Sequence, residues 1–163
     1  MGYEVEAVAL SWEEGANIIV GQSHFIKTAE DLAEIVGGAV PGAEYGLAFC
    51  EASGPCLIRT EGNNEKLVAQ AVECARQVGA GHSFFLLLSK AFPINVLNAI
   101  KACPEVARVF CATANPLEVL VVQTAQGRGI VGVVDGFPPK GLEGAQDRKE
   151  RRELLRRFGY KLG

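Results

Sequence analysis

The sequence predicts one α/β domain over residues 1–163, more narrowly α+β, in which helices pack on a mixed, largely antiparallel sheet. Two observations predict this class. Segments typical of strands follow one another in adjacent pairs more often than they alternate with helices, and 163 residues suit one core of ordinary size. Apolar residues make up 48% of the chain, a surplus that favours subunit interfaces and hence an oligomer.

Two hairpins are expected in the first third of the chain. Residues 4–11 alternate polar and apolar side chains, residues 17–20 are short and β-branched, and we expect the two to pair across residues 13–16. Residues 45–51 and 56–60 form the second expected pair, because the Ala-Ser-Gly-Pro sequence between them favours a tight turn.

Two helices have clear start and stop signals. The first is predicted over about 29–37, with Thr28 as its cap and the Gly-Gly pair that follows as its end. The second carries an apolar stripe from Leu67 to Val78, is capped by Asn63 or Asn64, and ends at Gly79.

The second half predicts a buried strand followed by further strands and two helices. Residues 83–88 are apolar without interruption, as in a strand buried on both faces. Pro93 is expected to begin a helix that ends near Ala102. The remaining expected elements are strands at 106–112, 118–124 and 130–134, and a closing helix at about 143–158.

Charge and composition exclude several classes of protein. Residues 147–161 carry a net charge of +4 in a total of −3, but their apolar residues favour a solvated amphipathic helix over nucleic-acid binding. No apolar run approaches the ~20 residues of a membrane span, and the first residues have no basic stretch followed by an apolar core, so we expect a protein that is not exported. Five unclustered cysteines and two histidines favour reduced thiols without a dedicated zinc site, and we expect a cytoplasmic protein.

The sequence Gly79-Ala80-Gly81-His82 is the first candidate site. Its glycines allow a ligand to approach the backbone, and the imidazole at the start of a buried strand can act as nucleophile, acid or base. A hydrogen-bonded core histidine explains the same pattern.

A glycine-rich stretch supplies the second candidate. Gly127, Arg128, Gly129 and Lys140 would offer amides and cations to a phosphate, and Asp135 would bind Mg²⁺ or a ribose hydroxyl. The alternative is a hairpin turn that leads into a proline-rich loop.

A helix start gives the third candidate. Its free amides suit phosphate, and Asn95 and Asn98 share one polar face of the helix that begins at Pro93. The alternative is that this face only meets water. Residues 23–27, which include His24, offer a second imidazole beside another helix start.

Several motifs together resemble the adenosine-specific kinase family. They cover nearly the whole chain in the order FCEASG (49–54), GAGHSF (79–84), AFPINVLNAIK (91–101), ATANP (112–116), QGRGI (126–130) and VDG (134–136). Asn63-Asn64 departs from the Asn-Asp that the family pattern leads us to expect.

The resemblance implies a trimer or hexamer that binds adenosine, AMP or a related adenine nucleotide, and a histidine that carries phosphate. By position that histidine is His82, with His24 as the second candidate. Our hypothesis is transfer of the ATP γ-phosphoryl group to an adenosine-type acceptor, with His82 and Asp135 catalytic and Mg²⁺ on Asp135. Phe84, Phe92 or Phe137 would then flank the adenine. The alternative is a non-catalytic oligomer that senses AMP or adenosine.

Overall fold

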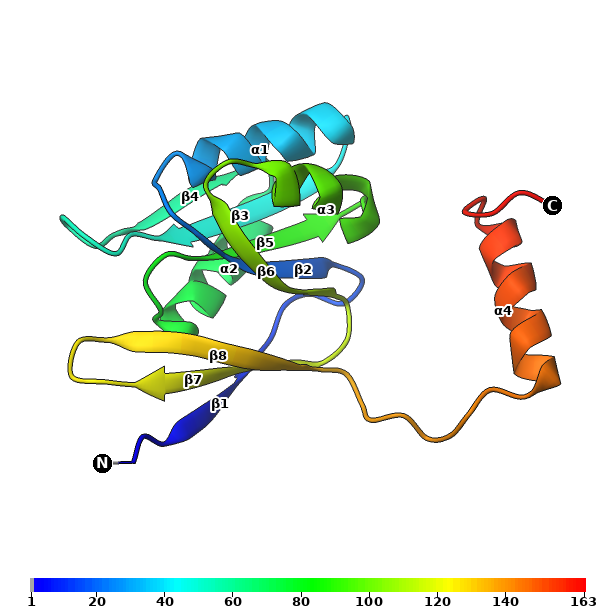
Figure 1. The fold of residues 1–163 in the computed structure, drawn as a ribbon. Helices are drawn as coiled ribbons and strands as arrows, with labels where there is room; N and C mark the ends of the chain where they lie inside the picture. Colours follow the sequence, from blue (N-terminus) through cyan, green and yellow to red (C-terminus); the bar gives the residue numbers. More distant parts are fainter. Residues whose placement is uncertain (1) are drawn as a thin grey trace.

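The computed structural model describes residues 2–163 as two antiparallel sheets and four helices (Figure 1). The elements, in chain order, are β1 Val5–Leu10, β2 Asn17–Ser23, α1 Thr28–Ala39, β3 Glu44–Cys50, β4 Ile58–Gly62, α2 Glu65–Val78, β5 Ser83–Ser89, α3 Pro93–Ala102, β6 Val106–Thr113, β7 Leu117–Gln123, β8 Arg128–Asp135 and α4 Ala145–Arg157. The α+β class expected from the paired strands is confirmed.

The larger sheet has the order β4-β3-β5-β2-β6, and the smaller one has the order β1-β7-β8. Helices α1 and α3 cover one face of the larger sheet, whereas α2 and the smaller sheet lie against its other face (Figure 1). Strands β5 and β2 are therefore central and buried on both sides, which explains the uninterrupted apolar run that predicted the first of them.

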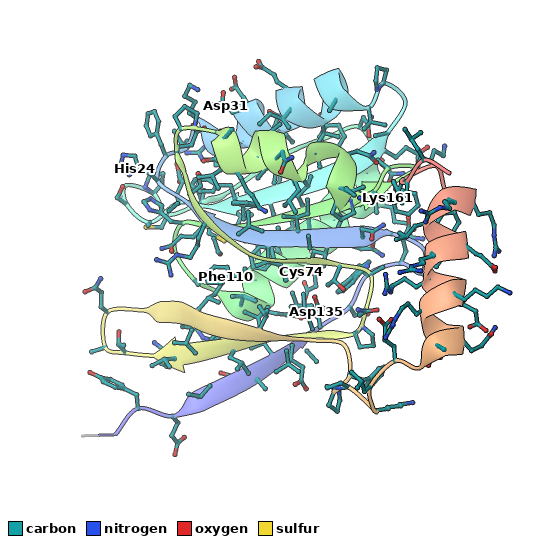
Figure 2. The ribbon with its side chains drawn as sticks, turned by 45° about the vertical axis from the view of Figure 1, so that its right-hand side comes forward. His24, Asp31, Cys74, Phe110, Asp135 and Lys161 are labelled. Carbon is teal, nitrogen blue, oxygen red and sulfur yellow. The ribbon has the colours of Figure 1, made fainter. Side chains whose placement is uncertain are left out.

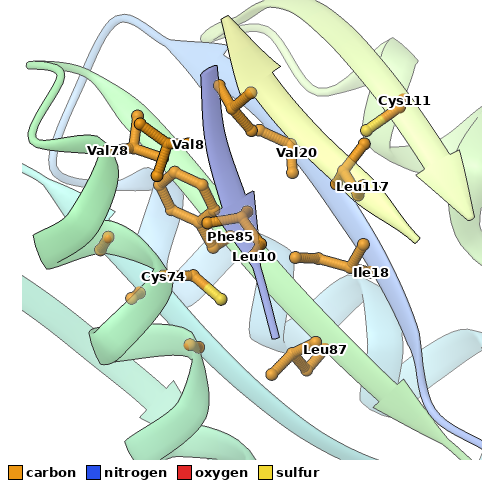
Figure 3. Packing of buried hydrophobic residues seen from close by; sticks show 14 of the residues in the cluster. Val8, Leu10, Ile18, Val20, Cys74, Val78, Phe85, Leu87, Cys111 and Leu117 are labelled. Carbon is orange, nitrogen blue, oxygen red and sulfur yellow. The ribbon is translucent and has the colours of Figure 1, made fainter. Parts of the chain in front are cut away.

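Side chains alternate between two cores on either side of the larger sheet. Ile19 and Phe84 point to α1 and α3, while Val20 and Phe85 point to α2 and the smaller sheet. Figure 3 shows this second core, where Phe85 lies among Val8 of β1 and Val78 of α2. Burial of these large side chains, at roughly 1.5–3 kcal/mol each, holds the three layers together.

The predicted hairpin of the first two strands is wrong. β1 pairs with β7 in the smaller sheet, and β2 pairs with β5 and β6 in the larger one. The reason is burial, because β1 keeps one face exposed whereas β2 is buried along almost its whole length. The second hairpin is confirmed, with Cys50 of β3 opposite Ile58 of β4.

The ends of α2 are confirmed residue by residue. The Asn64 side chain accepts a hydrogen bond from the Leu67 amide at 3.1 Å, and Gly79 ends the helix in the left-handed conformation.

Helix α1 differs from the prediction. It continues through the Gly-Gly pair to Ala39, and the Thr28 hydroxyl donates to the Phe25 carbonyl instead of capping the helix.

The closing helix is confirmed but lies apart from the rest of the molecule. Figure 1 shows α4 separated from both sheets, at the end of an extended segment that follows β8. None of its residues is buried, and Phe158 remains 63% exposed. No described helix has the length and apolar character that a membrane span requires.

Contact between β3 and α2 makes Gly46 intolerant of a side chain. A Cβ atom at this position would lie 2.2 Å from the Leu67 carbonyl carbon and 2.2 Å from the Val68 amide nitrogen, both backbone atoms. We expect Gly46→Ala to lower the free energy of unfolding by about 3 kcal/mol. Gly37→Ala is the control, since its Cβ meets nothing within 4 Å in α1, and it should stabilise by up to about 1 kcal/mol. Urea denaturation of both variants measures the difference; equal stabilities would contradict the close packing.

Candidate functional site

One end of the larger sheet holds the candidate site. In this antiparallel order β2 ends at Ser23 and β3 ends at Cys50, where β5 begins. His82 lies between them, because its amide donates to the Cys50 carbonyl at 2.8 Å and its carbonyl accepts from the Ser23 amide at 2.8 Å. Both peptide groups of the histidine are thus fixed by neighbouring strands.

The backbone of His82 is strained. Its φ angle is +62°, in the left-handed region that side chains other than glycine adopt at a cost of roughly 1–2 kcal/mol. The half-buried imidazole stacks on Phe49 with ring centroids 5.9 Å apart and an interplanar angle of 20°. A strained conformation that positions one chemically versatile side chain is a feature of functional sites.

His24 provides a second imidazole at the same place. Its ring centroid is 6.3 Å from that of His82, and the two rings are nearly perpendicular, at 84°. His24 is exposed at the start of the turn that leads into α1, and its amide donates to the Glu105 carbonyl at 2.8 Å. This spacing and angle are those of an edge-to-face ring contact, and two adjacent imidazoles of this kind can supply one nucleophile and one acid or base.

The glycines before His82 separate two small hollows. One hollow, of about 150 Å³, lies between Gly81 and Gly129 and has Phe110 in its wall; the other, of about 240 Å³, lies between Gly79 and Cys56. Each is smaller than the roughly 300 Å³ of ordinary ligand pockets. His82 lines neither hollow, because its ring points to the opposite face of the sheet, toward Phe49.

Arg128 is brought to this end of the sheet but is already engaged. It forms a β-bridge with Ala80, its guanidinium donates to the Gln77 carbonyl at 2.9 Å, and it forms an ion pair with Glu6. Gly127 belongs to the turn between β7 and β8, where the Thr124 amide donates to its carbonyl at 2.8 Å. The second glycine-rich segment therefore lies beside the first, and Arg128 connects the start of β8 to the end of α2.

This chain matches a known protein family and a known structure. A family model described as "Adenosine specific kinase" matches residues 8–161. The chain belongs to the adenosine-specific kinase family. The crystal structure of the PH1918 protein from Pyrococcus horikoshii OT3 is similar to this chain. The two sequences are 42% identical, and the structures align with a TM-score of 0.94 over 99% of this chain and 100% of that one. Comparison with curated proteins gives no match.

Asp135 lies far from His82 in this member of the family. Its carboxylate accepts from the Thr113 hydroxyl at 2.7 Å, and Thr113 pairs with Ile18 near the start of β2, whereas His82 bonds to the last residue of that strand. Five residues of strand separate these positions by about 17 Å. Figure 2 shows His24 and Asp135 toward opposite ends of the sheet. The expected pairing of His82 with Asp135 in one site is therefore not formed within one chain.

The remaining predicted residues also lie away from the imidazoles. Helix α3 begins where β5 ends, at the far end of the sheet, and the Asn95 side chain accepts from the Phe92 amide as part of its own helix cap. Asn98 is exposed further along α3, and Lys140 lies in the segment between β8 and α4. The helix on the His24 side of the sheet is α1, which begins at Thr28, four residues after His24.

Asp135 is already hydrogen-bonded to neighbouring side chains. One of its oxygens accepts from both the Thr113 hydroxyl and the Asn115 amide, at 2.7 and 3.3 Å. No cluster of three metal-ligating side chains within residues 2–163 includes Asp135. The Mg²⁺ role of Asp135 stays a prediction, and within one chain this carboxylate is distant from His82.

The aromatic residues predicted to flank an adenine are not exposed beside the imidazoles. Phe84 lies two residues from His82 and pairs with Phe49, but it is fully buried, and Phe92 and Phe137 follow the far ends of β5 and β8. The aromatic ring that sequence reasoning missed is Phe25, which is 52% exposed with its centroid 6.2 Å from that of His24. Its position next to His24 in the sequence was the available signal.

The strain at His82 gives a direct test of the geometry. Because φ is +62°, we expect His82→Gly to be more stable than His82→Ala by about 1 kcal/mol, although both variants lose the ring that stacks on Phe49. Thermal unfolding of the two purified variants checks this. An alanine variant as stable as the glycine variant would show that the left-handed conformation is absent.

Proposed function

We propose that this chain transfers the γ-phosphoryl group of ATP to adenosine or an AMP-type acceptor by way of phospho-His82. Membership of the adenosine-specific kinase family supports a kinase reaction on an adenosine compound. The observation that carries the assignment to His82 is its pairing with His24, at a centroid distance of 6.3 Å, on a strained and doubly anchored backbone.

The proposed chemistry has two displacements at phosphorus. In the first, an unprotonated ring nitrogen of His82 forms a bond to the γ-phosphorus as the bond from this phosphorus to the oxygen of ADP breaks. In the second, the acceptor hydroxyl attacks the same phosphorus, the P–N bond breaks, and the hydroxyl proton passes to His24. Mg²⁺ enters as part of the ATP substrate and requires no dedicated carboxylate of the protein.

Adenine recognition is proposed to use the exposed surface around Phe25. This ring and Ile26, which is 40% exposed, lie on the turn that carries His24. Aromatic and apolar side chains suit one face of a purine. The two hollows beside the glycines are too small for a nucleotide, so the proposed binding surface is open or completed by a second copy of the chain.

A homo-oligomer, a trimer or hexamer, is part of the proposal. The segment after β8 exposes Leu142 and Leu162 by more than nine tenths, and α4 buries nothing against its own chain. The relative's crystal structure aligns with 99% of the chain at a TM-score of 0.94, so the comparison includes most of the projecting segment. A second copy would cover these apolar side chains, and the net charge of +4 over residues 147–161 complements the −7 of the remainder.

Introduction of negative charge on the apolar side of α4 and its C-cap tests the oligomer. We expect Leu154→Glu with Phe158→Glu to lower the molar mass in solution to that of one chain, because two carboxylates would be buried without partners. Light scattering after size-exclusion chromatography measures it. Lys149→Ala, on the same helix with a side chain 68% exposed, should keep the wild-type mass. Unchanged mass in the double variant would contradict assembly through α4.

A non-catalytic sensor of AMP or adenosine is the second candidate function. Two observations favour it. The Arg128 guanidinium is engaged by other groups of the chain, and Asp135 lies at the far end of the sheet, so His82 and His24 are the reactive groups that remain at the site. A sensor would bind the nucleotide without gaining a covalent phosphoryl group. Phosphorylation therefore separates the two candidates.

Intact mass after incubation with ATP and Mg²⁺ tests the kinase proposal. We expect one added phosphoryl group that survives base and is lost in acid, none in His82→Gly, and AMP formed from adenosine. His24→Gln should still accept the phosphoryl group but form AMP about 100-fold more slowly, because a general acid or base is lost. The far-end variant Asn98→Ala is the control and should behave as wild type. AMP production that survives in His82→Gly would remove this histidine from the mechanism, and nucleotide binding without phosphorylation would favour the sensor.

A further inference from the structure

Three side chains that sequence analysis did not connect meet between α1 and the loop before β6. Asp31 lies on α1, Cys103 ends α3 and Glu105 follows in the loop, and one potential ligand atom from each lies within 4.8 Å of the other two. Figure 2 shows Asp31 on α1, on the side of the molecule that carries His24. We name these three residues the Asp31–Cys103–Glu105 cluster.

Glu105 is the unusual member of the cluster. It is only 7% exposed, and its Oε1 atom is buried with no hydrogen-bond partner among residues 2–163. A buried carboxylate oxygen without a partner is costly, so native structures nearly always supply one. The Asp31 carboxylate and the Cys103 thiol lie beside the Glu105 side chain, but Oε1 accepts no hydrogen bond from either.

The charged groups around the cluster leave this need unmet. Lys27 forms an ion pair with Asp31 from an exposed position, and the Cys103 thiol donates to the same Asp31 oxygen at 3.9 Å. Glu34 lies one turn further along α1 and is exposed. None of these contacts supplies a donor to Glu105 Oε1.

The ligand types indicate the class of cation. Mg²⁺ and Ca²⁺ prefer all-oxygen sites, whereas a thiolate with carboxylates suits Zn²⁺ and related transition metals. Zinc lies about 2.0–2.3 Å from such ligands, so the three atoms must close by about 1 Å to share one ion. A hollow of about 350 Å³, lined by Asp31 and Cys103, opens beside them and leaves access for the ion and for a water ligand.

We propose that the Asp31–Cys103–Glu105 cluster binds one divalent transition-metal cation of the zinc class. The cation supplies the missing partner of Glu105 Oε1 and links α1 to the connection between α3 and β6. Because the Glu105 carbonyl accepts from the His24 amide at 2.8 Å, the same link fixes the turn that carries His24. The site is independent of the proposed phosphoryl transfer, and no step of that reaction passes through the ion.

Binding of Co²⁺ and Zn²⁺ to the full chain tests the site. Metal-stripped protein is titrated with Co²⁺, and equilibrium dialysis with Zn²⁺ gives the stoichiometry. We expect one ion per chain, a sulfur-to-cobalt charge-transfer band in the near ultraviolet, and a higher melting temperature as Zn²⁺ is added.

Matched variants assign the ligands. Cys103→Ser should abolish the charge-transfer band, and Glu105→Gln should weaken Zn²⁺ binding by at least about tenfold. Cys56→Ser, which removes an exposed thiol outside the cluster, should change neither. Lys27→Met should tighten binding, because it removes the ammonium that competes for Asp31.

Two results would overturn the proposal. One is a wild-type chain that takes up no Co²⁺ or Zn²⁺ beyond the buffer control. The other is an unchanged stoichiometry and affinity in Cys103→Ser, which would place the ion elsewhere even if Glu105→Gln failed to fold. Neither readout depends on phosphorylation, so failure here leaves the proposed kinase reaction standing.

Discussion

Burial of β2 and β5 on both faces is the constraint on which the structure depends. These two strands form the middle of the larger sheet, and their side chains supply both cores. A strand with two buried faces has to be covered by a layer on each side, which is the role of α1 with α3 and of α2 with the smaller sheet. The candidate site exists because β2 ends where β5 begins, so His24 follows one central strand and His82 precedes the other.

Local signals predicted much of this fold. The apolar run at 83–88, the Asn64 cap and the Gly79 end are each decided within a few residues, and each was confirmed. The partner of β1 was not predictable in this way, because its pairing with β7 joins segments more than a hundred residues apart. The sequence showed that β1 alternates and β2 does not, and this difference was the signal that the two belong to different sheets.

The site was predicted less completely than the fold, and for a similar reason. The Gly-x-Gly-His motif could be recognised as a candidate from adjacent residues, but its companion His24 comes from a segment whose nearness follows from the order of the strands. Asp135 looked equally suitable as a residue type, and only strand direction shows that it lies at the other end. The Asp31–Cys103–Glu105 cluster has no motif at all, since Asp31 is far in sequence from the other two.

The anchoring of His82 limits how a phosphoryl group on its ring could be sensed. Its amide and carbonyl are both bonded to other strands, and its ring rests on a buried phenylalanine. Added phosphate would therefore change the local electrostatic potential while the main chain keeps its course. A macromolecule that distinguished the two forms would have to read negative charge at a fixed point, and its preference would weaken as ionic strength rises.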